Sequence, residues 1–203
     1  MSKCYVVFKG KETGIFDTWD ICKGATQGVA GSLYVSCESK EVAEELWNKA
    51  KMTDEAYENN EFKTGNEKIP EGVCVVYIAG SEKKANRYKV VYTIRTSNEV
   101  ITKDDYIDVP TIPNGKNGES EIDALMMALY ECVFTYGCYK IIVVNHCNST
   151  YAFAKGIWKP KNALTEEFTK VVNECYADVL FASDDNIMRN DEYDKTCMRL
   201  LRA

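Results

Sequence analysis

A short basic stretch at residues 155–161 surrounds an aromatic ring with lysines, and this combination can bind a nucleic acid. Lys155, Lys159 and Lys161 all lie within three residues of Trp158. An ammonium group can pair with a phosphate, while an indole ring can stack on a base or a sugar. The pattern also fits a surface loop whose tryptophan anchors it to a sheet, with the lysine stems covering apolar surface. The sequence leaves both interpretations open.

The charge of the chain does not favour a dedicated nucleic-acid module. The formal net charge is −6 over 203 residues, and residues 1–50 carry six lysines against seven carboxylates. Domains that bind a polyanion are usually basic. Scattered lysines such as Lys9 and Lys23 are therefore either phosphate contacts or part of an ordinary solvated face.

The first 50 residues carry a dense pattern of aromatic residues, glycines and lysines. Its core is the run Gly14-Ile-Phe16-Asp-Thr18-Trp19-Asp-Ile-Cys22-Lys23, with Tyr5-Val-Val-Phe-Lys9-Gly10 before it and Gly31-Ser-Leu-Tyr34 after it. This pattern resembles the small hybrid-binding domain at the N-terminus of eukaryotic-type ribonuclease H, which also occurs in caulimovirus viroplasmin.

The resemblance implies a role for the aromatic residues of this segment. Tyr5, Trp19 and Tyr34 fall on positions where the family packs rings on a sugar–phosphate backbone, and Lys9 and Lys23 are the phosphate contacts that remain. Two basic residues that normally follow the third aromatic are absent here. The alternative for Tyr5 and Trp19 is core packing in a very small domain.

Hydrophobic periodicity and the positions of turn-forming residues divide the chain into two folded units. The first unit, residues 1–50, is predicted as a small α+β domain with three strands and two helices, the second helix capped by Ser39. Residues 51–71 are polar and rich in Glu, Asn and Lys, so they are predicted as a linker. The predicted elements of the first unit are strands Tyr5–Lys9, Gly14–Phe16 and Leu33–Glu38 and helices Thr18–Thr26 and Ser39–Trp47.

Residues 72–203 are predicted as an α/β domain with a ribonuclease H-like mixed five-stranded sheet and helices. Three strands follow one another directly, and two further strands alternate with helices. Unbroken apolar runs predict doubly buried central strands. The predicted strands are Val73–Ala79, Lys89–Thr96, Val100–Asp108, Lys140–Val144 and Asp178–Ala182, and the helices are Glu119–Tyr136, Ser149–Gly156, Leu164–Cys175 and Asn190–Arg202.

The ribonuclease H resemblance implies a site of four carboxylates that hold two divalent cations. The family's first strand ends in Asp-Gly-Ser, and this chain has Ala79-Gly80-Ser81. The glutamate that opens the long helix is kept as Glu121, and the aspartate of the terminal helix is kept as Asp194. The third carboxylate position falls on His146, anchored by Gly156-Ile-Trp158, and the family's mobile histidine falls on Ser183.

These departures predict a degenerate catalytic site. An alanine offers no ligand, and a histidine nitrogen suits zinc or copper better than Mg²⁺. Glu121 and Asp194 are the metal ligands only if a site survives; otherwise they are carboxylates favoured by helix N-termini. No cofactor is expected for an inactive protein, and Mg²⁺ or Mn²⁺ for an active one.

Three functions remain compatible with the sequence. The preferred hypothesis is an inactive ribonuclease H-like protein that binds an RNA/DNA hybrid or double-stranded RNA, or acts as an assembly subunit. The alternatives are an active metal-dependent ribonuclease H and a protein-interaction scaffold without nucleic-acid affinity. Nine cysteines without a C-x-x-C pair, and no signal peptide or transmembrane run, predict reduced thiols and a cytoplasmic protein with no membrane association.

Overall fold

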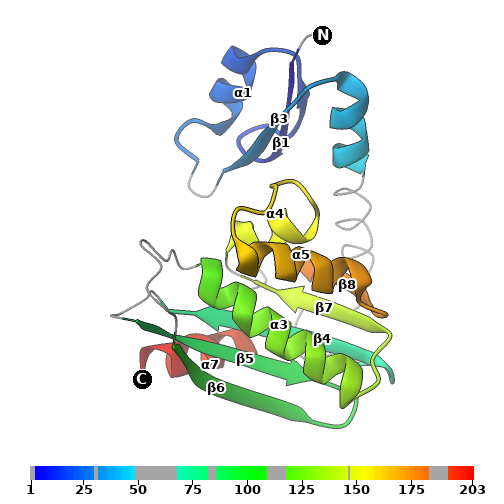
Figure 1. The fold of residues 1–203 in the computed structure, drawn as a ribbon, viewed down its shortest axis with the longest axis vertical. Coiled ribbons are helices and arrows are strands. Elements are labelled where there is room, and N and C mark those ends of the chain that lie inside the picture. Colours follow the sequence, from blue (N-terminus) through cyan, green and yellow to red (C-terminus); the bar gives the residue numbers. More distant parts are fainter. Residues whose placement is uncertain are drawn as a thin grey trace.

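The chain forms a small three-stranded domain and a larger domain built on a five-stranded sheet (Figure 1). The structure is a computed structural model, and it describes residues 3–29, 32–48, 68–81, 86–108, 118–145, 147–182 and 192–203. The strands are β1 Cys4–Lys9, β2 Gly14–Phe16, β3 Leu33–Cys37, β4 Val73–Gly80, β5 Arg87–Arg95, β6 Val100–Asp108, β7 Lys140–Val144 and β8 Asp178–Ala182. The helices are α1 Trp19–Thr26, α3 Gly118–Phe134, α4 Asn148–Ala154, α5 Ala163–Glu174 and α7 Glu192–Arg202, with a further helix over 40–48.

The small domain is a sheet with one helix on each face. Its strand order is β2-β1-β3, and both pairings are antiparallel. Because side chains alternate across a strand, Val6 packs with Ala43 of the helix 40–48, whereas Val7 packs with Cys22 and Ala25 of α1. Hydroxyl caps start both helices: Thr18 Oγ1 accepts from the Ile21 amide, and Ser39 Oγ accepts from the Val42 amide.

The large domain has the predicted ribonuclease H-like sheet. The strand order is β6-β5-β4-β7-β8, in which β4, β5 and β6 pair antiparallel and β4, β7 and β8 pair parallel. Strand β5 begins two residues before the predicted Lys89, because the antiparallel ladder with β6 continues to Arg87, where an ion pair with Asp108 joins the two strands at 3.1 Å.

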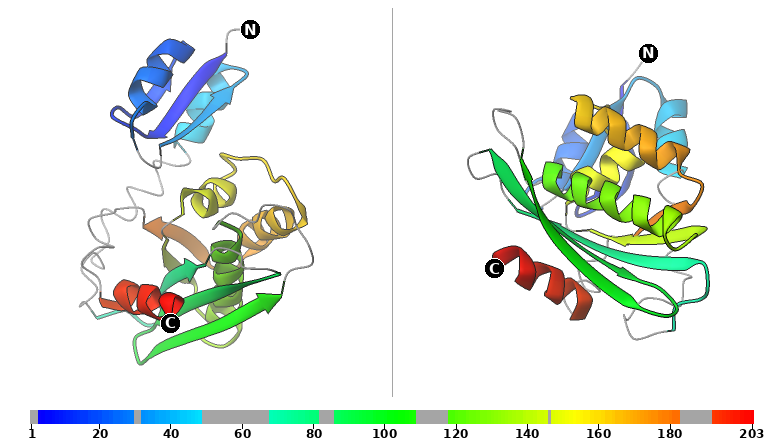
Figure 2. Two further views of the ribbon diagram at one scale, coloured as in Figure 1. Left: turned by 90° about the vertical axis from the view of Figure 1, so that its left-hand side faces the viewer. Right: turned by 60° about the horizontal axis from the view of Figure 1, so that its bottom comes forward.

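Helices cover both faces of this sheet, and the apolar strands divide their side chains between them (Figure 2). Val76 and Ile78 of β4 belong to the main core under α3, α4 and α5, whereas Tyr77 and Ala79 belong to the smaller core under α7. Ile69, which falls within the predicted linker, is buried in the smaller core. Most of the predicted linker lies outside the described residues.

One sequence-based prediction about the cysteines is wrong. Cys74 of β4 and Cys138, just before β7, form a disulfide with their Cα atoms 6.4 Å apart, which lies within the range that such a bond can span. The prediction of uniformly reduced thiols fails because residues 64 positions apart become neighbours only when β4 and β7 pair. Within the described part of the chain, no helix is both long and apolar enough to cross a membrane.

Candidate nucleic-acid interface and carboxylate positions

Three aromatic rings form a continuous surface on the small domain. The ring of Trp19 lies between those of Tyr5 and Tyr34, with 5.6 Å between centroids on each side and interplanar angles of about 50°. Trp19 is 42% exposed and Tyr34 is 39% exposed, while Tyr5 is half-buried. This arrangement offers aromatic faces to an external ligand, whereas a core cluster would bury them.

Strand register and one helix start place these rings together. Tyr34 pairs with Val7 in the β1–β3 ladder, so it lies on the same face as Val7 and diagonally across from Tyr5. Trp19 is the first residue of α1, which packs on that face. Behind the rings, burial raises the pKa of the Cys22 thiol, so Cys22 is an inert core residue rather than a reactive one.

A close contact at Gly10 fixes the end of β1 against α1. A side-chain Cβ at this position would lie 2.6 Å from the Ala25 carbonyl oxygen, and that oxygen accepts the Lys11 amide at 2.7 Å. Only glycine allows this approach, since real Cβ atoms do not come so near to a backbone oxygen. The contact sets the course of the chain that carries Lys9 and Lys11.

The end of β4, where the family's first aspartate is expected, packs directly against the start of α3. A Cβ at Gly80 would lie 2.1 Å from Ser120 Oγ, and Ser120 Oγ donates to the Ser81 carbonyl at 2.9 Å. Ala79 itself is buried and points to the α7 face of the sheet. A methyl group therefore occupies the position where the resemblance implies a carboxylate.

Glu121 and Asp194 are both buried and both stand in the first turn of a helix. Glu121 Oε2 accepts a hydrogen bond from the Cys147 amide at 3.0 Å, which ties α3 to the segment that follows β7. Asp194 lies on α7, which packs on β4 and β5 through Cys197. Both carboxylates benefit from the partial positive charge at a helix N-terminus.

Asn145 follows β7 and was not singled out from the sequence. Its Nδ2 donates to the Cys147 carbonyl at 2.8 Å, and its Oδ1 is buried without a hydrogen-bond partner among the described residues. The sequence signal that could have identified it is a polar residue directly after an apolar parallel strand. His146 and Ser183 lie outside the described residues.

The described residues offer few side chains that could bind a metal ion. Searching the described ranges finds no group of three or more His, Cys, Asp or Glu side chains that could hold a metal ion. Among the described residues, Glu121 and Asp194 are the carboxylates that the resemblance assigns to the site, and the Ala79 side chain has no ligand atom. This donor set does not fit the two-cation arrangement that the resemblance implies.

The basic stretch at residues 155–161 is partly tied to the core. Lys155 Nζ donates to the Val179 carbonyl at 3.2 Å and lies 5.4 Å from the centre of the Phe181 ring. Trp158 packs edge-on against Phe153 at 5.6 Å. Lys159 is exposed. The anchoring role is thus evident for Lys155 and Trp158, and Lys159 is the side chain best placed to meet a phosphate.

Comparison with known proteins gives a family match for the small domain. Residues 3–47 match the family model described as the ribonuclease H1 N-terminal domain. The chain resembles a type 1 ribonuclease H with its N-terminal domain. No curated protein matches the chain at a significant level.

Solved structures of ribonuclease H1 proteins are similar to part of this chain. The enzyme of Halobacterium salinarum is 17% identical, covers 58% of this chain and 90% of its own, and gives a TM-score of 0.44. The N-terminal ribonuclease H domain of a Mycobacterium tuberculosis protein is 14% identical, covers 63% and 95%, and gives 0.47. The LC11 ribonuclease H1 in complex with an RNA/DNA hybrid is 18% identical, covers 64% and 99%, and gives 0.45.

Proposed function

We propose that this protein binds an RNA/DNA hybrid or double-stranded RNA through its N-terminal domain and does not cleave it. The observation that carries the proposal is the exposed aromatic surface of Tyr5, Trp19 and Tyr34, in a segment that matches the ribonuclease H1 N-terminal domain. Rings in van der Waals contact with one another give a surface on which sugars or bases can pack.

Phosphate contacts supply the remaining binding energy. Lys9 and Lys23 flank the aromatic surface in sequence, and Lys159 projects from the large domain. Each lysine that neutralises a phosphate releases a counterion, so affinity falls steeply as salt rises. With few such lysines and a net charge of −6, binding is weak at physiological salt.

The residues at the end of β4 support the proposal that the protein is inactive. Ala79 has no oxygen with which to bridge two cations, and the neighbouring Gly80 is packed so closely on Ser120 that no larger residue fits there. Without a shared ligand, two cations cannot stabilise both the attacking and the leaving oxygen. A role as an assembly subunit is the second function that we propose for an inactive chain.

An active enzyme is the second candidate, and one observation favours it. Glu121 and Asp194 are both buried in the first turn of a helix. The Cys147 backbone accepts a hydrogen bond from Asn145 Nδ2 and donates one to Glu121 Oε2, so a third polar side chain follows β7. Mg²⁺ or Mn²⁺ would be the cofactor of such a rearranged site.

The test combines binding and cleavage on one set of duplexes. Fluorescence anisotropy with RNA/DNA, double-stranded RNA and double-stranded DNA should give weak, salt-dependent binding that prefers the RNA-containing duplexes. The same hybrid, incubated in Mg²⁺ and separately in Mn²⁺, should remain intact. Turnover that disappears in Glu121→Gln would establish the active enzyme, and equal binding by the parent and Trp19→Ala would remove the aromatic surface from the proposal.

A further inference from the structure

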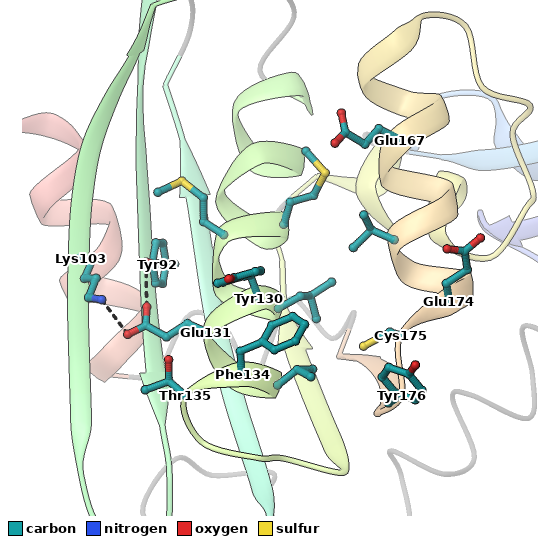
Figure 3. A pocket seen from close by; sticks show the side chains of 15 residues that line it. Tyr92, Lys103, Tyr130, Glu131, Phe134, Thr135, Glu167, Glu174, Cys175 and Tyr176 are labelled. Atoms are coloured by element: carbon teal, nitrogen blue, oxygen red, sulfur yellow. Dashed lines mark hydrogen bonds and ion pairs between the residues drawn. The ribbon is translucent and has the colours of Figure 1, made fainter.

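A groove of about 720 Å³ runs between α3 and α5, beside the outer strands of the large sheet (Figure 3). Its wall is mostly apolar, with Met126, Met127 and Leu129 from α3 and Val171 from α5. Methionine side chains adapt their shape to different apolar partners. The groove lies on the large domain, and none of the residues proposed to bind nucleic acid lines it.

Large aromatic rings border this groove and remain open to solvent. Tyr130 is 67% exposed, Phe134 is 70% exposed and Tyr176 is 95% exposed. The rings of Tyr130 and Phe134, one helical turn apart on α3, contact each other with their centroids 4.6 Å apart. Exposed tyrosine and phenylalanine side chains around an apolar groove are typical of a protein-binding surface.

The two walls of the groove differ in how their charged side chains are paired. Lys103 Nζ pairs with Glu131 Oε1 at 2.7 Å, and the Tyr92 hydroxyl donates to Glu131 Oε2 at 3.0 Å, so the charge of Glu131 is satisfied. Glu167 and Glu174 lie exposed on α5 along the opposite wall, and neither has an ion-pair partner within the described segments. Figure 3 shows both residues on α5: the Glu167 carboxylate points toward α3, and the Glu174 carboxylate lies on the solvent side of α5, away from α3.

We propose that this groove binds an amphipathic helix of a partner protein, with apolar side chains on one face and two basic residues spaced two turns apart on its flank. The seven-residue separation of Glu167 and Glu174 places them about 10 Å apart along α5. Basic residues at i and i+7 of a helix lying along α5 meet both carboxylates. Apolar anchors at intervening i+3 and i+4 positions reach the methionine wall.

The negative charge of Glu167 and Glu174 also disfavours other ligands in the groove. A nucleic acid is repelled by two unpaired carboxylates, and a second copy of this chain would bring the same carboxylates face to face across a two-fold axis. The inference does not rest on hybrid binding, and each can fail without the other.

The probe is a synthetic 16-residue helical peptide with leucines along one face and lysines at positions 5 and 12. Titration into the isotopically labelled full chain should shift the amide resonances of α3 and α5, with an affinity in the micromolar range or weaker. Replacing both lysines with glutamate should weaken binding at least tenfold.

Charge exchange makes the test specific for the groove. The double variant Glu167→Lys with Glu174→Lys should lose the lysine peptide and gain the glutamate peptide, whereas the matched control Glu166→Lys, on the same helix but outside the groove, should behave as the parent. Shifts that map elsewhere, indifference to the charge exchange, or no binding up to 1 mM peptide would overturn the proposal. So would a concentration-dependent dimer in sedimentation that Phe134→Glu dissociates, because the occupant would then be a second copy.

Discussion

The two domains differ in which of the residues implied by the resemblance they retain. The small domain keeps Tyr5, Trp19 and Tyr34 in contact, with Trp19 and Tyr34 exposed and Tyr5 half-buried. The large domain keeps the sheet and the helix starts that position Glu121 and Asp194, but its first strand ends in Ala79. We therefore expect a binding surface built from a few rings to tolerate the loss of a member better than a catalytic site built from four carboxylates.

The difference reflects how each kind of site depends on its members. Ring packing contributes energy in increments, so under the proposed function a surface without the two basic neighbours should still bind, though less tightly. A two-metal site needs all of its ligands within a fraction of an ångström, so loss of one ligand removes most of the rate.

Restoring the carboxylates should produce activity where the parent has none. The triple variant Ala79→Asp, His146→Asp and Ser183→His should cleave an RNA/DNA hybrid in Mg²⁺, far more slowly than a natural enzyme because the ligands lack preorganised support. A labelled-hybrid cleavage assay measures the rate, with the added change Glu121→Gln as the control. A folded triple variant that binds no divalent cation would mean that the positions of Ala79 and His146 are wrongly assigned.

The single variant Ala79→Asp should be strongly destabilised without metal. Placing an unpaired carboxylate at this buried position is expected to lower the free energy of unfolding by about 3 kcal/mol in EDTA. If Glu121 and Asp194 lie close enough to share a cation, Mg²⁺ should recover part of that loss in urea unfolding. The control is Ala128→Asp in the middle of α3, which is buried equally and should not respond to Mg²⁺.

Removal of the central ring should weaken nucleic-acid binding about tenfold, a typical value for one stacked aromatic. We expect Trp19→Ala to show this loss in anisotropy while its circular dichroism spectrum stays that of the parent. Tyr176→Ala removes an even more exposed ring from the large domain and should bind hybrid normally. Equal affinity for both variants would instead favour a scaffold without nucleic-acid affinity.

Lys159 and Lys155 of the basic stretch should contribute differently to the salt dependence of nucleic-acid binding. Lys159→Ala is expected to reduce the slope of log affinity against log salt by about 1, because a single phosphate contact is lost. Lys155→Ala should leave the slope unchanged, since its ammonium group is held by the Val179 carbonyl and the Phe181 ring. Identical slopes for the two variants would show that the stretch makes no phosphate contact.

The smallest effect should come from Asp123, which accepts a hydrogen bond from the Tyr88 hydroxyl of β5. Burial raises the pKa of Asp123, and this effect outweighs the lowering by the Tyr88 hydroxyl. The folded state thus binds this proton more tightly than the unfolded chain. The resulting stability is fully present below the unfolded-state pKa and is lost as pH rises through the folded-state pKa.

This linkage can be measured against Asp123→Asn, which does not titrate. The free energy of unfolding of the parent relative to the variant should increase by about 0.5 kcal/mol or less between pH 7 and pH 4. The exposed Asp178→Asn serves as the control. A relative stability that decreases over the same interval would contradict the direction given for Asp123.

The sequence by itself determined most of the elements and their caps. Unbroken apolar runs predicted the central strands β4 and β7, Ser39 marked the start of the helix 40–48, and the succession of strands and helices predicted the mixed sheet. These features depend on side chains that are near neighbours in the chain, so local patterns carry them. The aromatic residues of the N-terminal domain were also identified, through their match to a known motif.

The tertiary structure alone decided which distant residues meet. Strand pairing brings Cys74 to Cys138, the approach of β4 to α3 leaves no space beyond a hydrogen at Gly80, and the packing of α3 against α5 leaves a groove lined by Tyr130 and Glu167. Each contact depends on register and helix placement, which arise from packing of the whole core rather than from local periodicity. The sequence therefore specified the parts of both sites, and only the folded chain determined how those parts are arranged.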